Sequence, residues 1–597
     1  MPDTARPLSP NQTTALTDPA RIVVVEACPG SGKTRLFVEK ALREIIAVQQ
    51  SRKGVAVLSF TNAATDEIQR RLEKNGFKGV YPHYIGTLDS FFLRFVIQPF
   101  GSSLGLLPTQ GLSLIPAELV QRYKGPNVPG VQITIHDRPG LHECDIISWE
   151  PPQCSTQDRY GHRIFLDENM SRRILEAKVA SWRASGNVTH SDSHVLSSAI
   201  LTMPTMKDKV SSIILRRFPL ILVDEFQDTL EFHAQALKEL MKRSDARGFI
   251  VGDPDQAIFN WSGARPENFQ EIYSFDGVNK QLLPHNFRSA QKICDVVTHI
   301  APSGIQMSGK LPSEVLGKVI LLEHDWGNAP SLSSLGDWLR SKISPGERVA
   351  IIARENQTIS RLQGIANSAF SCPIESTLAV QLQRIGLLWN QRENKKAATS
   401  AWANLGFLLF QDPKVQRTTI ENSGINSRQW KKAIRLLILE SAKADGQETW
   451  DQWRERMKIT ILTIASNLGR QGQVNNLSHL LARRGNDLDE ARPSFTGSSI
   501  QSSWPLNTEF LTVHSAKGRE FEVVLYLIAP SSRQRPCPSS YWFQQGSGEN
   551  QEERRIAYVA MTRAIRLLVL CMHSSTAENI RSSAPSGFLS NLLTETL

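Results

Sequence analysis

Cysteine is scarce in this chain of 597 residues. The seven cysteines are odd in number and scattered, and no two of them form a CxxC pair, so neither a disulfide framework nor an iron–sulfur cluster is indicated. Reduced thiols in a reducing compartment fit this distribution best. One further combination, Cys144 and Cys154 with His142 or His162, has a spacing that zinc sites use.

Long hydrophobic runs are also missing. The longest ones, such as Val523 to Ala529, are far shorter than the roughly 20 residues that span a bilayer. The first twelve residues do not contain the apolar core of a signal peptide. We therefore expect a cytoplasmic protein, or a nuclear one if the host is a eukaryote.

The length and the charge set broader limits. At roughly 100 to 200 residues per domain, 597 residues predict three to five domains. With 40% hydrophobic and 21% charged residues, the composition is that of an ordinary folded protein. The 68 Lys and Arg outnumber the 58 Asp and Glu, and the resulting charge of +10 fits a polyanionic partner such as nucleic acid without requiring one.

Short β-branched runs alternate with helical patterns in two parts of the chain, which predicts an α/β fold with parallel sheets and crossover helices. In the first part we expect a helix at 34–48 and strands at 22–27, 55–60, 220–225 and 249–253. In the second part we expect strands at 319–324, 349–354, 510–515, 523–529 and 567–573. The alternation is interrupted at 99–205 and at 375–500, where we expect inserted subdomains, the second one mostly helical.

A glycine-containing loop, ACPGSGKT (27–34), follows the first expected strand. Glycines allow backbone amides to approach phosphate oxygens, and the helix that follows presents its N-terminus to the anion. Lys33 would contact the β- and γ-phosphates, and Thr34 would bind Mg²⁺. Ala27 stands where the usual form of this loop has glycine.

A pair of acidic residues follows the strand LILV in the segment DEFQDT. Asp224 and Glu225 then lie at the carboxyl edge of the sheet, where open α/β sheets bind their ligands. Asp224 would hold Mg²⁺ through water, and Glu225 would orient and deprotonate an attacking water. Two acids in this position also occur as a simple helix cap.

The chain resembles the superfamily 1A helicases of the UvrD, PcrA and Rep type through an ordered set of motifs. In chain order these are SPNQTTAL, ACPGSGKT, SFTNAAT (59–65), GTLDSF (86–91), DEFQDT, VGDPDQAIFNWSGA (251–264), LPHNFRS (283–289), TVHSAKGREF (512–521) and EERRIAYVAMTRA (552–564). Three positions depart from the common pattern. The family commonly has His where this chain has Asp89 and Tyr where it has Phe287, and frequently has Arg where it has Ser262.

The resemblance implies two RecA-like P-loop domains with parallel sheets, each carrying an inserted, mainly helical subdomain. The implied boundaries are 1–98 and 206–290 for domain 1A, 99–205 for subdomain 1B, 291–374 and 506–597 for domain 2A, and 375–505 for subdomain 2B. Only 34 residues follow Arg563, so we expect any nuclease to be a separate chain.

The resemblance also implies roles in ATP hydrolysis with Mg²⁺. Gln12 would read adenine, Phe287 would stack on it, and Glu520 would contact the ribose. Gln256 would sense the γ-phosphate, and Arg288 and Arg563 would be arginine fingers. The implied catalytic residues are Lys33, Asp224, Glu225, Gln256, Arg288 and Arg563, and Thr34 and Asp224 would hold the metal. The implied nucleotide-binding residues are Gln12, Ala27, Cys28, Pro29, Gly30, Ser31, Gly32, Lys33, Thr34, Arg35, Phe287, Arg288, Glu520 and Arg563.

A translocase must bind DNA of any sequence, so its DNA-binding surface needs aromatic rings that stack on bases and hydrogen-bond donors for the phosphate backbone. The candidates are Phe60, Thr61, Asn62, Thr87, Phe259, Trp261, His514 and Ser515. The implied function is an ATP-dependent DNA helicase in the cytoplasm, associated with the nucleoid, that moves 3′ to 5′ on single-stranded DNA and unwinds duplexes at junctions. Two alternatives stay open: a DNA-stimulated ATPase subunit that serves a separate nuclease in repair or antiphage defence, and a nucleic-acid-binding protein with degenerate ATPase activity.

Cys28 lies inside the phosphate loop near Lys33 and backbone amides. Such surroundings lower the pKa of a thiol, which would make Cys28 a candidate redox switch. The simpler interpretation is a small side chain that the loop tolerates.

Overall fold

The structure is a computed structural model. It describes residues 7–49, 51–77, 81–109, 111–114, 134–136, 153–157, 163–165, 167–259, 265–312, 315, 317–325, 329–362, 377–390, 394–410, 412, 415, 417–443, 448–474, 504–505, 507–529, 537–543 and 549–597. These residues fall into two compact units, one formed by 1–323 and 513–596 and the other by 324–512 with residue 597. Among the helices that the structure describes, none has both the length and the apolar composition needed to cross a membrane.

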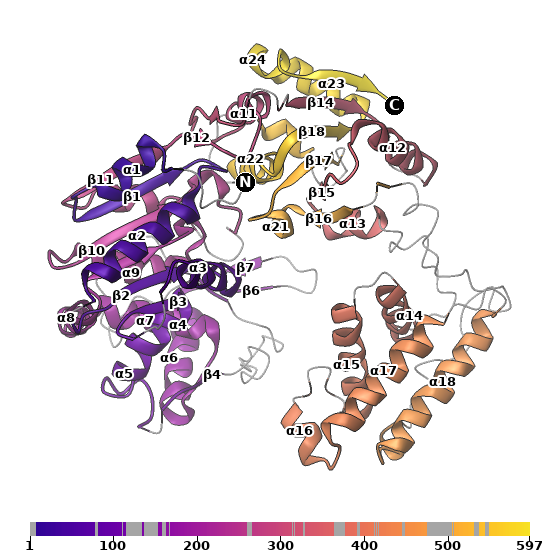
Figure 1. The fold of residues 1–597 in the computed structure, drawn as a ribbon. Helices are drawn as coiled ribbons and strands as arrows, with labels where there is room; N and C mark the ends of the chain where they lie inside the picture. The colour runs from indigo at the N-terminus through magenta and orange to yellow at the C-terminus, as the bar shows by residue number, and fades with distance from the viewer. Residues whose placement is uncertain are drawn as a thin grey trace. The chain divides into compact units, whose positions relative to one another are not determined.

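A six-stranded parallel sheet forms the first layer of the larger unit (Figure 1). Its order is β11-β1-β10-β9-β2-β3, and the strands are β1 (Ile22–Ala27), β2 (Val55–Ser59), β3 (Tyr84–Thr87), β9 (Leu220–Val223), β10 (Arg247–Gly252) and β11 (Val278–Leu283). The inner strands are continuous apolar runs, as expected for a parallel sheet that is covered on both faces.

Alternate residues of these strands enter two separate cores. Val23 and Val25 pack with Leu36 and Phe37 of α2, in a core built with α1 (Pro10–Thr17), α2 (Lys33–Ala47) and α3 (Asn62–Lys74). Ile22 and Val24 face the opposite core. That core is built with α4 (Leu88–Phe92), α7 (His190–Thr202), α8 (Lys207–Arg217), α9 (Glu231–Lys242) and α10 (Asn268–Tyr273).

A second group of parallel strands in the same unit has the order β17-β18-β14-β19. They are β14 (Lys318–Glu323), β17 (Phe521–Ile528), β18 (Ala564–Met572) and β19 (Leu593–Thr596). The helices of this region are α11 (Gln291–Thr298), α21 (Val513–Ala516), α22 (Glu549–Met561), α23 (Ser574–Ser583) and α24 (Ser586–Leu589). In this region the predicted strand at 510–515 is wrong in its last three residues, because α21 begins at Val513 and therefore contains His514 and Ser515.

The described part of the first insertion combines helices with short strands. It contains α6 (Glu168–Ser185), α7, the parallel pair β4 (Ser113–Leu114) and β8 (Asn187–Val188), and an antiparallel sheet of β5 (Thr134–His136), β6 (Gln153–Gln157) and β7 (Arg163–Phe165). Both α7 and the strand β8 before it contribute buried residues to the core on the Ile22 face.

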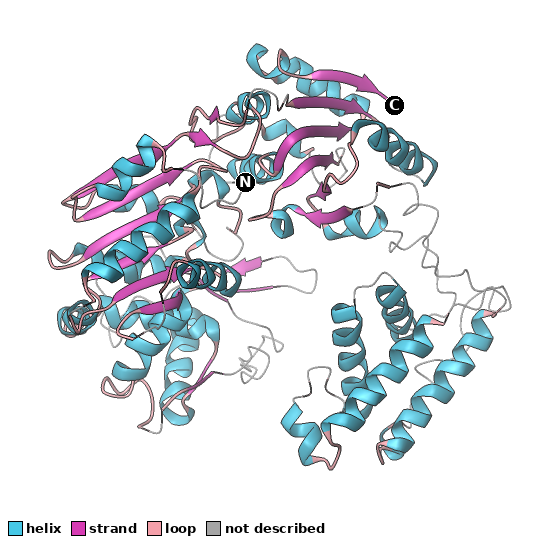
Figure 2. Cartoon of the chain, viewed as in Figure 1, coloured by secondary structure: helices cyan, strands magenta, loops and turns pink. Residues whose placement is uncertain are grey.

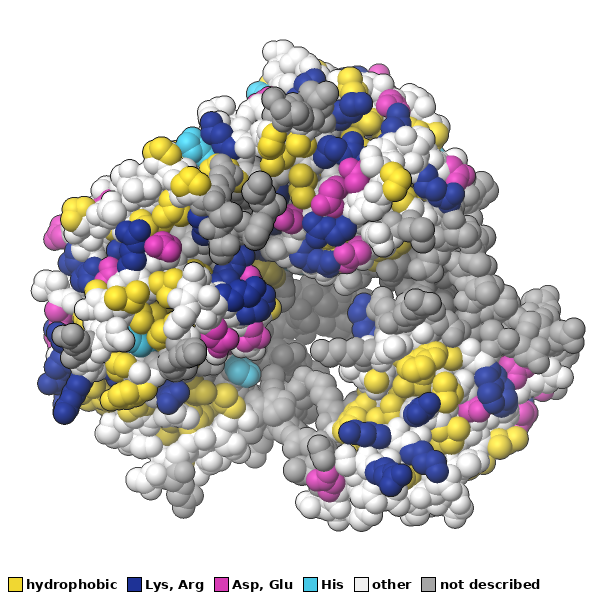
Figure 3. All heavy atoms as spheres, viewed as in Figure 1, with side chains coloured by type: hydrophobic (Ala, Val, Ile, Leu, Met, Phe, Trp, Pro, Cys, Tyr) yellow, Lys and Arg dark blue, Asp and Glu magenta, His cyan; other side chains and the backbone are white. Residues whose placement is uncertain are grey.

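The smaller unit contains a parallel pair, β15 (Val349–Ala353) and β16 (Thr508–Thr512), and several helices (Figure 2). Its described helices are α12 (Ala329–Lys342), α13 (Asn356–Leu362), α14 (Thr377–Asn390), α15 (Asn394–Phe410), α16 (Arg417–Asn422), α17 (Ser427–Ala442) and α18 (Trp450–Asn467). The α14 to α18 bundle has its own core, in which Trp430 and Trp453 are buried. Figure 3 shows hydrophobic side chains gathered on one face of this bundle, with Lys and Arg around them. The chain is therefore an α/β protein with two parallel sheets and added helical parts.

Candidate ATP and DNA sites

The phosphate loop connects β1 to α2, as the sequence predicts. Gly30 and Gly32 have φ of 69° and 78°, the left-handed region that favours glycine. A Cβ on Gly30 would lie 2.6 Å from Cβ of Arg288, and one on Gly32 would lie 2.7 Å from Nε2 of Gln12. The loop therefore needs both glycines for its conformation and for its close neighbours.

Gln12 supports this loop from α1. Its Nε2 donates a hydrogen bond to the carbonyl of Ser31 at 2.8 Å, and its Oε1 accepts one from the amide of Ser9 in a capping box. Ser31 is itself buried, and its hydroxyl has no hydrogen-bond partner among the described residues. A hydroxyl without a partner beside glycine amides is the kind of donor that a phosphate oxygen would satisfy.

The two acids follow β9 directly. Asp224 is buried and accepts a hydrogen bond from the amide of Glu225 at 3.0 Å, while Glu225 has a left-handed φ of 52° and turns its side chain toward Lys33, 3.9 Å away. Burial and the charge of Glu225 raise the pKa of Asp224 to about 7. Burial opposes the ionisation of Glu225 as well, but Lys33 and Lys517 outweigh it and lower the pKa of Glu225.

Arg563 and Gln256 meet beside these acids. Nη2 of Arg563 lies 3.3 Å from Oε1 of Gln256, whose Nε2 donates to Asp253 at 2.6 Å. Burial, followed by the nearby charge of Arg288, lowers the pKa of Arg563 to about 9. Arg563 therefore stays positively charged at neutral pH, which an arginine finger requires.

Arg288 and Glu520 form an ion pair, with Nε of Arg288 2.8 Å from Oε2 of Glu520. Arg288 also donates to the carbonyl of Thr562 at 3.2 Å. Glu520, the predicted ribose contact, is thus engaged with a predicted arginine finger in this structure. The amide of Phe287 donates to the carbonyl of Gly30 at 2.8 Å, which ties the Phe287 segment to the phosphate loop.

One pocket of about 600 Å³ collects most of the predicted nucleotide-binding residues. Its lining residues are Pro7, Gln12, Pro29, Gly30, Ser31, Gly32, Lys33, Thr34, Arg35, Arg71, Glu225, Gln256, Phe287, Arg288, Leu311, Gly518, Glu520, Arg563 and Ile565. Ala27, Cys28 and Asp224 are buried and do not line it. Four lining residues were not predicted because no motif marks them: Pro7, Arg71, Leu311 and Ile565. Gly518 was not predicted either, although it lies inside the motif TVHSAKGREF.

The residues in and next to this pocket suit a magnesium nucleotide. The hydroxyl of Thr34 and the carboxylate of Glu225, which line the pocket, and the buried carboxylate of the adjacent Asp224 are oxygen donors of the type that Mg²⁺ prefers. Lys33, Arg288 and Arg563 supply the positive charge that a triphosphate requires.

The environment of Cys28 contradicts the expected reactive thiol. Cys28 is 1% exposed, and burial raises the pKa of its thiol, with the charge of Asp253 acting in the same direction. Lys33 and Arg288 lower it by less. The prediction of a lowered pKa is therefore wrong, because the burial of the thiol outweighs the nearby positive charges of Lys33 and Arg288.

A row of rings lies among the predicted DNA contacts. The ring centroids of Phe60 and Phe259 are 5.8 Å apart, and those of Phe259 and His514 are 5.7 Å apart. Nζ of Lys517 lies 4.9 Å from the centroid of the Phe259 ring. Three predicted contacts from separate motifs thus lie together beside a cation.

The remaining predicted DNA contacts lie at helix ends. Thr61 caps α3 by accepting from the amide of Ala64, and Thr87 caps α4 by accepting from the amide of Ser90. Asn62 and Ser515 are exposed. Trp261 lies outside the described residues, as do the side chains of Cys144, Cys154, His142 and His162.

Lys517 connects the segment after α21 to the acidic segment. Its Nζ lies 2.6 Å and 2.7 Å from the two carboxylate oxygens of Asp228 and 2.7 Å from the carbonyl oxygen of Gln256. Burial raises the pKa of Asp228 to about 6 even though Lys517 acts against it. Lys517, from the motif TVHSAKGREF, therefore contacts the motifs DEFQDT and VGDPDQAIFNWSGA and lies next to the Phe259 ring.

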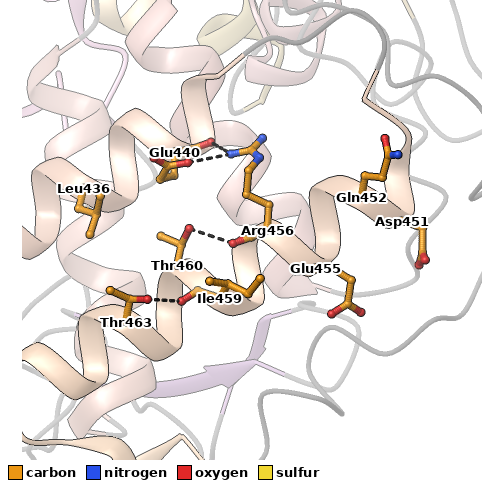
Figure 4. A pocket seen from close by; sticks show the side chains of 9 residues that line it. All are labelled: Leu436, Glu440, Asp451, Gln452, Glu455, Arg456, Ile459, Thr460 and Thr463. Carbon is orange, nitrogen blue, oxygen red and sulfur yellow. Dashed lines mark hydrogen bonds and ion pairs between the residues drawn. The ribbon is translucent and has the colours of Figure 1, made fainter.

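The smaller unit has a groove of its own, about 620 Å³, between α17 and α18 (Figure 4). Arg456 spans it, since its guanidinium donates to the carbonyl of Glu440 at 2.6 Å and to both carboxylate oxygens of Glu448 at 2.7 and 2.8 Å. Without a phosphate loop or an acidic pair, this groove does not resemble the nucleotide pocket.

Comparisons with known proteins agree with this geometry. The family model for the UvrD/REP helicase N-terminal domain matches residues 8–108 and 158–275, and the model for the UvrD-like helicase C-terminal domain matches 459–575. Together the two models match more than half of the chain. DNA helicase II of Salmonella typhimurium is 23% identical over 94% of this chain and 84% of its own length.

Two further relatives differ in their coverage. A probable DNA helicase II homolog of Rickettsia conorii is 23% identical over 98% of this chain and 96% of its own length. The Gabija protein GajB of Bacillus cereus is 24% identical over 58% of this chain and 60% of its own length. From the two family models, the parallel sheets and the helicase relatives, we conclude that the chain belongs to the UvrD/Rep-type superfamily 1 DNA helicases.

Proposed function

We propose that this protein is an ATP-driven motor that moves 3′ to 5′ on single-stranded DNA and unwinds duplexes. The observation that carries the proposal is the single pocket that brings Lys33, Glu225, Gln256, Arg288 and Arg563 together from five separate motifs. The direction of movement rests on the family resemblance. A DNA substrate would place the motor with the nucleoid, or in the nucleus of a eukaryotic host.

In this proposal, Lys33 and the amides around Gly30 and Gly32 hold the phosphates. Thr34 and Asp224 hold Mg²⁺, which neutralises phosphate charge when it is bound. Glu225, with its pKa below the usual value, is ionised and can accept the proton of the attacking water. Arg288 and Arg563 stabilise the charge that develops on the transferred phosphoryl group.

The linkage to DNA would pass through Gln256 and Lys517. Gln256 contacts Arg563 through its side chain and Lys517 through its carbonyl, and Lys517 lies against the Phe259 ring. A change at the γ-phosphate therefore has a short path of direct contacts to the proposed stacking surface. Glu520 would leave Arg288 for the ribose when the nucleotide binds.

The first test is ATP hydrolysis with and without single-stranded DNA. We expect DNA to stimulate the parent, Lys33→Ala to lose nucleotide binding, and Glu225→Gln to keep binding while hydrolysis falls by about 10²- to 10⁴-fold. Glu39→Gln serves as the control, because Glu39 lies on α2 outside the pocket and forms an ion pair with the exposed Arg43. A parent that shows no stimulation by DNA would rule out the motor.

The second test is strand displacement on duplexes with a 3′ or a 5′ single-stranded tail. We expect unwinding from the 3′ tail only, and none by Glu225→Gln. Unwinding from the 5′ tail would refute the proposed direction but not the ATPase.

A second function deserves a test because GajB, a relative that is not named as a DNA helicase II, matches 58% of this chain. The protein could be a DNA-stimulated ATPase subunit that serves a separate nuclease in repair or antiphage defence. That function predicts DNA-stimulated hydrolysis with little strand displacement, together with co-purification of a nuclease from the native host. Robust unwinding by the isolated chain would exclude it.

A further inference from the structure

Two histidines and one aspartate from distant parts of the chain converge in the larger unit. Asp89 lies on α4, His194 on α7 and His233 on α9, three neighbouring helices on one side of the first sheet (Figure 1). One ligand atom from each residue lies within 4.8 Å of the other two. Asp89 is also one of the positions at which the chain departs from the common pattern of its family.

The distances between these atoms match the edges of a metal coordination shell. Oδ1 of Asp89 lies 3.1 Å from Nε2 of His194 and 3.4 Å from Nδ1 of His233. In a tetrahedral zinc site with metal–ligand bonds of about 2.0 to 2.1 Å, neighbouring ligand atoms lie about 3.3 Å apart. Both distances from Oδ1 of Asp89 thus suit a shared ion, and the two histidine nitrogens lie within 4.8 Å of each other.

An ordinary hydrogen-bonded triad explains this cluster less well. Nε2 of His194 is buried and lies 3.1 Å from Oδ1 of Asp89, but the angles of this contact are not those of a good hydrogen bond. A buried nitrogen that lacks a well-directed hydrogen bond is costly. A cation between Nε2 and Oδ1 would satisfy both atoms at their present separation.

The surroundings hold the ligands and leave one side open. The ring of Phe92 stacks on His233 with centroids 5.1 Å apart, which fixes the orientation of that imidazole. His233 is 2% exposed, whereas the side chain of Asp89 is 43% exposed. Water can therefore reach the cluster from the Asp89 side and supply a fourth ligand.

We propose that Asp89, His194 and His233 form a binding site for a divalent transition metal, with Zn²⁺ as the best match. Two imidazoles with one carboxylate suit Zn²⁺ and its transition-metal neighbours, while Mg²⁺ prefers oxygen ligands alone. The site is therefore separate in place and in chemistry from the proposed magnesium nucleotide pocket.

The metal would tie together three parts of the chain. Residue 89 follows the motif strand β3, residue 194 belongs to the first insertion, and residue 233 follows the acidic segment. Thr87, a predicted DNA contact, caps the same helix that carries Asp89. A bound ion would stabilise the packing of α4, α7 and α9 next to the proposed DNA contact Thr87.

The experiment uses the full chain, purified without a histidine tag and stripped with a chelator. Titration with Co²⁺, a spectroscopic substitute for Zn²⁺, is expected to give one equivalent of bound metal with visible absorption bands of tetrahedral cobalt, which Zn²⁺ then displaces. Zn²⁺ should also raise the melting temperature of the stripped protein.

The variants are Asp89→Asn and His194→Gln, with His299→Gln as the control outside the cluster. We expect each ligand variant to lose at least about 100-fold in metal affinity, because even residues behind the ligands change affinity by about 10- to 100-fold. Circular dichroism reports whether each variant is folded. A folded parent that binds neither Co²⁺ nor Zn²⁺ at micromolar concentration, or an unchanged affinity in both folded variants, would overturn the proposal.

Discussion

At the scale of single residues, Gly30 shows why the phosphate loop allows so little variation. Gly30→Ala adds a Cβ in the left-handed region and places it 2.6 Å from both Cβ of Arg288 and Oδ1 of Asn286. The left-handed conformation costs about 1–2 kcal/mol, and the clash also displaces Arg288, the proposed arginine finger. We expect the DNA-stimulated ATPase rate to fall by about 10-fold or more.

Gly76→Ala is the matched control for this substitution. Gly76 has an even larger φ of 89°, but a Cβ there would meet nothing within 4 Å. Both variants should lose thermal stability, Gly30→Ala by more because of its clash, and we expect a loss of ATPase activity in Gly30→Ala only. Equal ATPase activity in the two variants would mean that ATP hydrolysis does not depend on the present position of Arg288.

The buried Cys28 gives a second prediction at this scale. Because burial raises the pKa of its thiol, iodoacetamide at pH 8 should leave Cys28 unmodified in the native protein and modify it after denaturation. Peptide mass spectrometry measures both states. Cys294 and Cys571, which are also buried and whose thiol pKa burial also raises, should behave in the same way. Selective labelling of native Cys28 would restore the idea of a redox switch.

At the scale of elements, the sequence predicts the inner strands well and the outer ones poorly. The strand at Ile22–Ala27 is found with its predicted bounds, and the other predicted strands are found within a few residues. Of the strands in the two large parallel sheets, β3, β11 and β19 were not predicted, and all three lie at sheet edges. Edge strands have one paired side only, and residues such as those of VNKQLL in β11 are half exposed, so they lack the continuous apolar run that marks an inner strand.

The site shows the same division between local and long-range information. Spacing within a motif identifies the glycines, Lys33 and the two acids, because their chemistry depends on near neighbours. It does not reveal the pairing of Lys517 with Asp228, which are 289 positions apart, or the meeting of Asp89 with two histidines. Such partners are set by how the elements pack, and no local pattern records them.

The ion pair between Lys517 and Asp228 leads to a prediction about how elements are held together. Lys517→Met leaves a buried carboxylate without its cation, which costs about 3 kcal/mol in comparable pairs. With a pKa of about 6 in the parent, Asp228 is ionised at pH 8 and mostly protonated at pH 5. Since a protonated carboxyl needs no cation, the loss of stability should be larger at pH 8 than at pH 5.

Thermal denaturation at the two pH values measures this effect. The double variant Lys517→Met with Asp228→Asn should recover part of the loss at pH 8, because it removes the unpaired charge. Lys443→Met, which removes an exposed ion pair with Glu440, should change stability by less than about 1 kcal/mol at either pH. A loss for Lys517→Met that does not depend on pH would show that its packing, and not its charge, matters.

At the scale of the whole molecule, the excess of positive charge must be weighed against stacking as the source of DNA affinity. The net charge is +10, yet Lys and Arg are interspersed with Asp and Glu on the face that Figure 3 shows. Affinity that comes from phosphate contacts falls with salt, since each neutralised phosphate of a single strand contributes about 0.7 to the slope of log K against log salt. Stacking adds about 1–3 kcal/mol per base and depends little on salt.

These two terms can be separated by measuring single-strand binding by fluorescence anisotropy over a range of salt concentrations. For about four to six phosphate contacts, we expect a slope of about −3 to −4 for the parent. Phe259→Ala should weaken binding by about 10-fold while leaving the slope unchanged, because it removes a ring and no charge. Phe407→Ala, an exposed ring on α15, is the control and should change neither quantity. A flat salt dependence would show that the excess charge serves another purpose, and a changed slope in Phe259→Ala would show that the ring positions a cation such as Lys517 and does not stack on DNA.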